Sequence, residues 1–200
     1  MIKCNVNVCG TINRAASVKK GKDGNYLSFG VIVPIIGRND VQMDMEICVM
    51  LDVDKTKPST LAEGKKVNLT GVLNLRKRGG TQFYYLRAAS VEVAGKKDAD
   101  RLEGTMTFIG KLGKNGVESR ADKNGSTYLL FSAFSSDKDG EKREFTWVRF
   151  LYFNPKEDLE FLQPATYVQV EGDLQLGVYE DAITVDCRVS DVQPWTFDKQ

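Results

Sequence analysis

The same series of segments, in which apolar and polar residues alternate, occurs twice in the 200-residue chain, and this repeat is the feature that most limits how the chain can fold. In residues 1–93, three segments of alternating polarity precede a short stretch suited to a helix, and two more alternating segments follow. Residues 104–192 show the same order. The repeat places Gly10 with Gly104 and Gly71 with Gly172, so its offset grows from 94 to 101 residues, as loops of different length would produce. Because a period of two is typical of strands with one buried face, we predict an all-β protein made of two copies of one domain.

Each copy is predicted to hold five strands, with a short helix between the third and the fourth. In the first copy Pro58 starts a helix over residues 57–63, and in the second the helix falls over residues 155–162. Five strands with the helix at this place follow the plan of the OB barrel, which binds oligonucleotides or oligosaccharides across its second and third strands. Other small β-barrels share the pattern and stay open as alternatives. The predicted fold class is therefore two five-stranded OB-fold barrels in tandem.

The two copies differ in charge, although the whole chain has a formal net charge of only +1. Residues 1–95 hold 14 lysines and arginines against 8 acidic residues, a net charge of +6, and residues 103–200 hold 11 against 17, a net charge of −6. The charged stretch 96–102 is suited to a linker. We expect a basic domain, a linker and an acidic domain over these ranges, with different electrostatic roles or mutual attraction.

The composition excludes much catalytic chemistry. The chain has no histidine, so it can form no catalytic triad with an imidazole base and no histidine-ligated metal site. Its four cysteines form no CxxC pair and are expected to be buried thiols of a protein in a reducing cytoplasm. No stretch is long and apolar enough to span a membrane, and the first residues do not have the pattern of a signal peptide.

Asp44 and Glu46 share one face of a predicted strand and are the candidates for metal chemistry. Paired carboxylates can hold Mg²⁺ in a nuclease, but they can equally keep an edge strand soluble. No third carboxylate or lysine completes a nuclease pattern. We therefore expect no enzyme activity, no metal and no cofactor.

Residues 144–153 form the most aromatic segment, with five aromatic residues and one arginine. On a strand, Val148, Phe150 and Tyr152 would share one face and form core. A wide apolar surface beside a guanidinium, as on the opposite face, suits stacking against unpaired bases. The alternative is a strand buried on both faces. The candidate stacking face would carry Phe145, Trp147, Arg149, Leu151 and Phe153.

At this segment the second half resembles the bacterial single-stranded DNA-binding protein (SSB) family. Residues 146–153, Thr-Trp-Val-Arg-Phe-Leu-Tyr-Phe, match the family's third strand in order and spacing, and residues 167–174 are similar to its fourth strand. Tyr179, seven residues beyond Gly172, falls where the family has a DNA-stacking tryptophan. The resemblance covers about residues 103–193, and the first half matches only in layout. It implies that Trp147, Phe153 and Tyr179 stack on bases and that Arg149 supports this face or contacts phosphate.

The chain departs from the family pattern in three ways. The loop at residues 135–142 lacks the family's tryptophan, for which Phe134 is the nearest substitute. The acidic-tipped tail that recruits partners is not found after Trp195, so recruitment by that route is not expected. The half that resembles the family is also the acidic half. Two domains in one chain are similar to the tandem-OB SSBs, which implies a homodimer that supplies four folds and acts beside replication or recombination proteins.

Further candidates lie beside the aromatic face or on basic turns. Tyr128 and Phe134 share one parity on the second strand and would border that face. Of the three aromatic residues 83–85, Tyr84 is predicted to be the exposed one. Two basic turns between strands could neutralise phosphates or could simply be solvated hairpin tips. Their residues are Lys19, Lys20, Lys22, Arg76, Lys77 and Arg78.

These observations favour a sequence-independent single-stranded DNA-binding protein that acts in replication, recombination or repair, with RNA left open as a second ligand. The alternative is a protein-interaction or assembly module without catalytic activity, in which the opposite charges serve docking. A carboxylate-metal nuclease is the third hypothesis.

Overall fold

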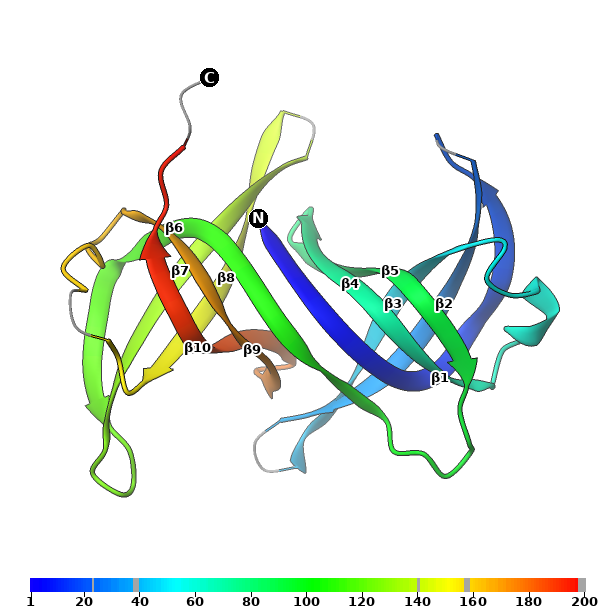
Figure 1. Cartoon of the computed structure of the whole chain (residues 1–200), viewed down its shortest axis with the longest axis horizontal. Helices are drawn as coiled ribbons and strands as arrows, with labels where there is room; N and C mark the ends of the chain where they lie inside the picture. Colours follow the sequence, from blue (N-terminus) through cyan, green and yellow to red (C-terminus); the bar gives the residue numbers. More distant parts are fainter. Residues whose placement is uncertain (23, 38–39, 140, 157–158, 198–200) are drawn as a thin grey trace.

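A computed structural model describes residues 1–22, 24–37, 40–139, 141–156 and 159–197 (Figure 1). Within these ranges the chain forms ten strands and the short 3-10 turn η2 (Pro58–Thr60), so the predicted all-β class is confirmed. The strands of the first half are β1 (Ile2–Lys20), β2 (Asn25–Ile36), β3 (Gln42–Asp52), β4 (Lys66–Arg78) and β5 (Thr81–Val93). Those of the second half are β6 (Arg101–Ala121), β7 (Thr127–Asp139), β8 (Lys142–Phe153), β9 (Tyr167–Tyr179) and β10 (Ala182–Pro194).

In each half the strand pairing returns to its starting strand. β1 pairs with β2, β2 with β3, β3 with β5 in parallel, β5 with β4, and β4 again with β1. The second half repeats this circuit from β6 through β7, β8, β10 and β9 back to β6. The inward residues of each circuit are apolar because the strands alternate as the sequence predicts, and Phe29 and Phe108 are among the largest fully buried side chains.

The register of these ladders corrects the alignment of the two copies. Gly10 faces Val67 on β4, whereas Gly110 faces Val168 on β9, and Gly71 and Gly172 occupy matching places on β4 and β9. The structural counterpart of Gly10 is therefore Gly110, not Gly104. The offset between the copies is nearly constant at 100 to 102 residues. The sequence alignment chose the wrong glycine because the second copy has one at position 104 and another at position 110.

The halves join through strand pairing. Ile2–Cys9 of β1 lies antiparallel to Arg101–Phe108 of β6, with Asn5 opposite Thr105 at the centre. Under the 100-residue offset the ladder maps onto itself, so the halves meet by an approximate two-fold relation. In Figure 1, β1 (dark blue) and β6 (green) run side by side between the two halves. β6 begins at Arg101, so the last two residues of the predicted linker are already part of this ladder.

The helices expected between the third and fourth strands are smaller than predicted. In the first half this position holds the single turn η2, which Pro58 begins. In the second half the described residues of 155–162 hold one turn, at 160–161, and no helix, and residues 157–158 lie outside the described ranges. No helix in the described ranges has the length and apolar character needed to cross a membrane.

The four cysteines, all within the described ranges, are free thiols, and Cys4, Cys9 and Cys187 are buried as predicted. Burial raises the pKa of the Cys4 thiol from 9.0 to about 12, because the apolar surroundings disfavour the thiolate. The thiol therefore stays protonated in the folded protein at pH values where it ionises in the unfolded chain.

This difference predicts a loss of stability at alkaline pH. The unfolded state releases the Cys4 proton above about pH 9 and the folded state holds it to about pH 12, so the free energy of unfolding falls across that window. By about pH 10.5 the thiol should account for a loss of roughly 2 kcal/mol. Urea unfolding at about pH 8 and pH 10.5 measures how far the free energy of unfolding falls. In Cys4→Ala this fall should be smaller by roughly 2 kcal/mol, the share due to the thiol. Equal losses in the two proteins would contradict the prediction.

Candidate nucleic-acid interface

The alternation predicted for residues 144–153 is confirmed in β8. Val148, Phe150 and Tyr152 are buried in the core, and Phe150 contacts Phe131 and Phe108 there with ring centroids 5.0 Å apart in each pair. The side chains of opposite parity point outward, and Trp147 is 53% exposed. The strand is therefore not buried on both faces. Its outer face is an aromatic surface in contact with solvent.

Trp147 is the centre of an aromatic cluster on this face. Its indole lies 4.9 Å from the ring of Phe134 on β7, and Phe134 also meets Phe145 edge-on at 5.3 Å between ring centroids. A Cβ on Gly113 would come within 3.1 Å of the indole, so glycine at this position on β6 gives the ring its space. The cluster presents exposed ring surface of the kind on which bases stack.

A groove with a volume of about 870 Å³ runs beside Trp147 at the junction of the two halves, and we call it the junction groove. The second half supplies Phe145, Trp147 and Arg149 from β8 and the end of the β9–β10 hairpin, where Tyr179 is 65% exposed. The first half contributes to the same groove from the β2–β3 loop and the β4–β5 hairpin. These residues are Ile36, Gly37, Lys77, Gly80 and Gln82.

A second groove of about 740 Å³ lies on the other side of Trp147, and we call it the β6 groove. It is formed by the irregular part of β6 around Gly113 and by Phe134, and Lys111 and Lys114 line it. The ammonium of Lys111 lies 6.0 Å from the centre of the Tyr167 ring. Trp147, Arg149 and Ser132 line both grooves. The two hollows therefore meet at the indole.

Arg149 does not present a free positive charge. Its Nε donates a hydrogen bond of 3.1 Å to Oδ1 of Asp186, and its Nη2 donates to Oδ2 of the same carboxylate. Asp186 lies opposite Arg149 in the parallel ladder of β10 and β8. The positive charge of Arg149 is thus offset by a carboxylate, and the paired hydrogen bonds fix the orientation of the guanidinium.

Tyr128 and Phe153 form a separate pair at the far end of the same strands. Their rings stack at 4.9 Å, and the guanidinium carbon of Arg188 lies 5.0 Å from the centre of the Phe153 ring. Both rings are half-buried and line neither groove. Trp147, Tyr179, Arg149 and Phe134 are brought together, whereas Phe153 and Tyr128 lie beside them.

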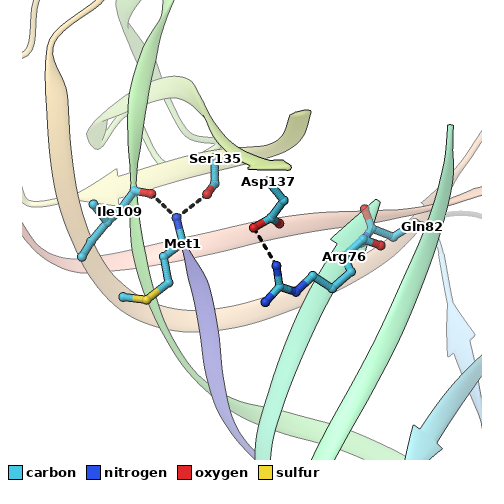
Figure 2. Close-up of polar contacts among 6 residues, drawn as sticks. All are labelled: Met1, Arg76, Gln82, Ile109, Ser135 and Asp137. Atoms are coloured by element: carbon cyan, nitrogen blue, oxygen red, sulfur yellow. Dashed lines mark hydrogen bonds and ion pairs between the residues drawn. The ribbon is translucent and has the colours of Figure 1, made fainter. Parts of the chain in front are cut away.

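The basic turn at residues 76–78 reaches the second half. Figure 2 shows Nη1 of Arg76 donating a 2.8 Å hydrogen bond to Oδ1 of Asp137 on β7, so this arginine forms an ion pair between the halves. Nearby, the Met1 ammonium donates to the carbonyl of Ile109 at 2.6 Å and to Ser135 Oγ. Burial lowers the pKa of this ammonium, while Asp137 acts in the opposite direction.

The other basic turn lies away from the grooves. Lys19, Lys20 and Lys22 are exposed on the β1–β2 hairpin, which projects from the outer edge of the first half at upper right in Figure 1. None of them lines the junction groove or the β6 groove. Lys77, in contrast, lines the junction groove, and Arg78 is exposed at the end of β4.

Tyr84 is only 8% exposed, so its selection as the outward aromatic of residues 83–85 is wrong. It shares its inward parity with Leu86, and its burial raises the pKa of the phenol to about 12. Phe83 and Tyr85 point outward instead, with stacked rings 6.4 Å apart. The signal in the sequence was Arg87, a charged residue of the same parity as Phe83 and Tyr85.

Asp44 and Glu46 share the exposed face of β3, as expected from their spacing. The Asn13 amide donates a 3.1 Å hydrogen bond to Glu46. In the part of the chain that the structure describes, no group of three or more cysteine, aspartate or glutamate residues is placed to hold a metal ion.

Some groove residues were not selected from the sequence. Phe145 was placed on the candidate stacking face by its parity, and the structure confirms that it is exposed there and lines the junction groove. Lys111 and Lys114 come to the grooves through the irregular course of β6, and Gln82 comes through the contact between the halves. No local pattern marks these three residues.

Comparisons with known proteins agree with this architecture. No family model matches the chain, and no curated protein matches it in sequence. Among solved structures, the wild-type single-stranded DNA-binding protein of Thermus aquaticus matches with a TM-score of 0.51 and 14% identity, over 98% of this chain and 95% of its own. The small single-stranded DNA-binding protein of Streptomyces coelicolor covers 49% of this chain and 97% of its own at 17% identity, with a TM-score of only 0.36.

The chain therefore shares the fold of the Thermus single-stranded DNA-binding protein over nearly the whole length of both chains. The resemblance to the SSB family, which the sequence carries in its second half, is confirmed at the level of the fold and extends to the first half as well.

Proposed function

We propose that the protein binds single-stranded DNA without sequence preference, through base stacking on the outer face of its second half. The observation that carries this proposal is the exposed Trp147 cluster between two grooves, with Tyr179 across the junction groove. Stacking on aromatic rings contributes about 1–3 kcal/mol per base and accepts any base, because every base has a π face. The fold shared with the Thermus protein supports the same function.

In this proposal each closed circuit of strands is an OB-type barrel, over residues 1–95 and 103–200. The site lies where such a barrel binds ligands, across its second and third strands, which are β7 and β8 in the second half. Trp147, Tyr179 and Phe134 stack on bases, and Arg149, held by Asp186, supports the stacking face. Phe153 and Tyr128 extend the same face. Roles in replication, recombination or repair follow from this binding.

A stacking site and an assembly module make different demands on the same aromatic face. An assembly surface needs a flat apolar patch that a second protein can cover. The Trp147 cluster instead lies between two grooves, and each groove is lined by at least one lysine. Hollows with amines at their edges suit a negatively charged, segmented ligand better than a protein surface. Single-stranded nucleic acid is therefore the favoured occupant.

Tryptophan fluorescence tests this function directly. The chain has two tryptophans, so a Trp195→Phe variant leaves Trp147 as the reporter. Titration with oligo-dT at low salt should quench the emission, and the affinity should fall as salt is added because lysine–phosphate contacts release counterions. Duplex DNA of the same length should quench far less, since its bases are already stacked. No quenching by oligo-dT at low salt would contradict the proposed function.

A further inference from the structure

The outer face of the first half differs in chemistry from that of the second. Matching the halves through Gly71 and Gly172 makes Leu86 the counterpart of Cys187, and these residues face Val49 and Phe150 respectively in the two parallel ladders. Val49 therefore corresponds to Phe150. Counting back along β3 and β8 pairs Glu46 with Trp147 and Asp44 with Phe145.

This correspondence removes the stacking surface from the first half. Where the second half presents an indole and a phenyl ring, the first half presents two exposed carboxylates. Carboxylates offer no ring for a base and repel the phosphates beside it. The outer face of β3 thus carries two carboxylates, and the one arginine seen to contact it among the described residues is Arg14, whose Nη2 donates to Sγ of Cys48.

The first half nevertheless reaches the stacking site through its β4–β5 hairpin. Lys77, Gly80 and Gln82 line the junction groove together with Trp147. Gly79 and Gly80 turn the hairpin with φ values of 54° and 83°, a conformation that favours glycine. Within the described residues no carboxylate forms an ion pair with Lys77, so its ammonium is available to a ligand in the groove.

Contacts between the halves hold two parts of the groove wall in place. In the β4–β5 hairpin Arg76, the neighbour of Lys77, is paired with Asp137 of the second half (Figure 2). Beside β9, a Cβ on Gly37 would lie 2.7 Å from the Cβ of Val178, so Gly37 packs directly on that strand. Lys77 and Tyr179 therefore lie on walls of one groove that the contacts between the halves hold in place.

We propose that the first half binds the DNA strand through Lys77 of its β4–β5 hairpin and not through its own outer sheet face. A strand whose bases stack on Trp147 and Tyr179 passes along the junction groove, and Lys77 contacts its phosphate backbone there. Each chain then holds one continuous strand on one stacking face, with the two halves acting on the same strand. This inference rests on the proposed function, because it concerns the same ligand.

The test compares variants that each remove one lysine charge from the first half. Lys77→Gln removes the groove lysine, Lys20→Gln removes a lysine of the β1–β2 hairpin, and Lys55→Gln removes an exposed lysine that lines neither groove. Binding of a labelled oligo-dT of about 16 nucleotides, long enough for one OB face and its surroundings, is followed by anisotropy over a range of salt concentrations.

Lys77→Gln should lower the slope of log K against log salt by about 0.7 and weaken binding by about eightfold at roughly 50 mM salt, the effect of one lost phosphate contact. Quenching of Trp147 at saturation should be unchanged, because the stacking face is intact. Lys55→Gln and Lys20→Gln should bind as the unmodified protein does.

Two results would overturn the proposal. Equal affinities and slopes for Lys77→Gln and Lys55→Gln would mean that the hairpin does not contact the strand. Weaker binding of oligo-dT by Lys20→Gln, with unchanged binding by Lys77→Gln, would place the phosphate contacts of the first half on the β1–β2 hairpin. In either case quenching of Trp147 by oligo-dT would still support stacking on the second half. Absence of quenching in all variants would overturn the proposed function itself, and this inference with it.

Discussion

Replacing Trp147 with alanine should weaken binding of oligo-dT by about 30-fold, equivalent to roughly 2 kcal/mol of stacking free energy. The effect is large because the indole lies where the junction groove and the β6 groove meet. A strand that occupies both grooves would stack on Trp147 at the point where it passes from one groove to the other. Anisotropy of a labelled oligonucleotide measures the dissociation constant. Trp147→Phe should recover most of the affinity, because a phenyl ring can still stack.

The matched control is Phe197→Ala, which removes another exposed aromatic ring from the second half. Phe197 is 63% exposed, meets Tyr167 edge-on at 4.8 Å and lines neither groove, so its loss should leave the dissociation constant unchanged. The thermal unfolding of both variants should be close to that of the unmodified protein. If Trp147→Ala bound oligo-dT as tightly as Phe197→Ala, stacking on this face would be ruled out.

Gly104→Ala should lower the free energy of unfolding by about 3 kcal/mol, because a side chain is forced into the ladder that joins the halves. A Cβ at this position would lie 2.0 Å from the carbonyl oxygen of Asn5 and 2.9 Å from the Cα of Val6. Both atoms belong to the backbone of β1 and cannot rotate away. Urea unfolding followed by circular dichroism measures the change.

Gly95→Ala is the control for this substitution. A Cβ there would approach only the carboxylate of Asp98, at 3.3 Å, and that side chain can move. Its free energy of unfolding should stay within about 0.5 kcal/mol of the unmodified value. A Gly104→Ala protein as stable as Gly95→Ala would show that β1 and β6 do not pair as closely as described.

The local pattern of β8 was sufficient to predict which of its side chains point outward. Val148, Phe150 and Tyr152 are buried and Trp147 is exposed because alternation along a strand is a property of the backbone itself. Alternation also holds in β5, but the outward parity was assigned wrongly there, because the choice of Tyr84 did not use the charged Arg87 as a guide. Tyr84 is buried on the face that also carries Leu86.

Pairing across the sheet decided the properties that depend on two distant segments. Arg149 was predicted to support the stacking face or to contact phosphate, and the parallel ladder places Asp186 beside it, 37 residues away in the chain. Arg76 was expected to contact phosphates, and the meeting of the halves gives it Asp137 as a partner. Neither partner can be identified from spacing, because the register between non-adjacent strands follows from how the whole sheet closes.

Alternation and side-chain type in the sequence were sufficient to predict the all-β class, the two copies, the buried face of β8 and the aromatic surface around Trp147. The three-dimensional arrangement was needed to show that Gly10 corresponds to Gly110, that the first half carries Asp44 and Glu46 where the second has aromatic rings, and that Lys77 lies in the same groove as Tyr179. The physical reason is that these facts are set by the β1–β6 ladder, which places two surfaces about 100 residues apart in the chain against each other.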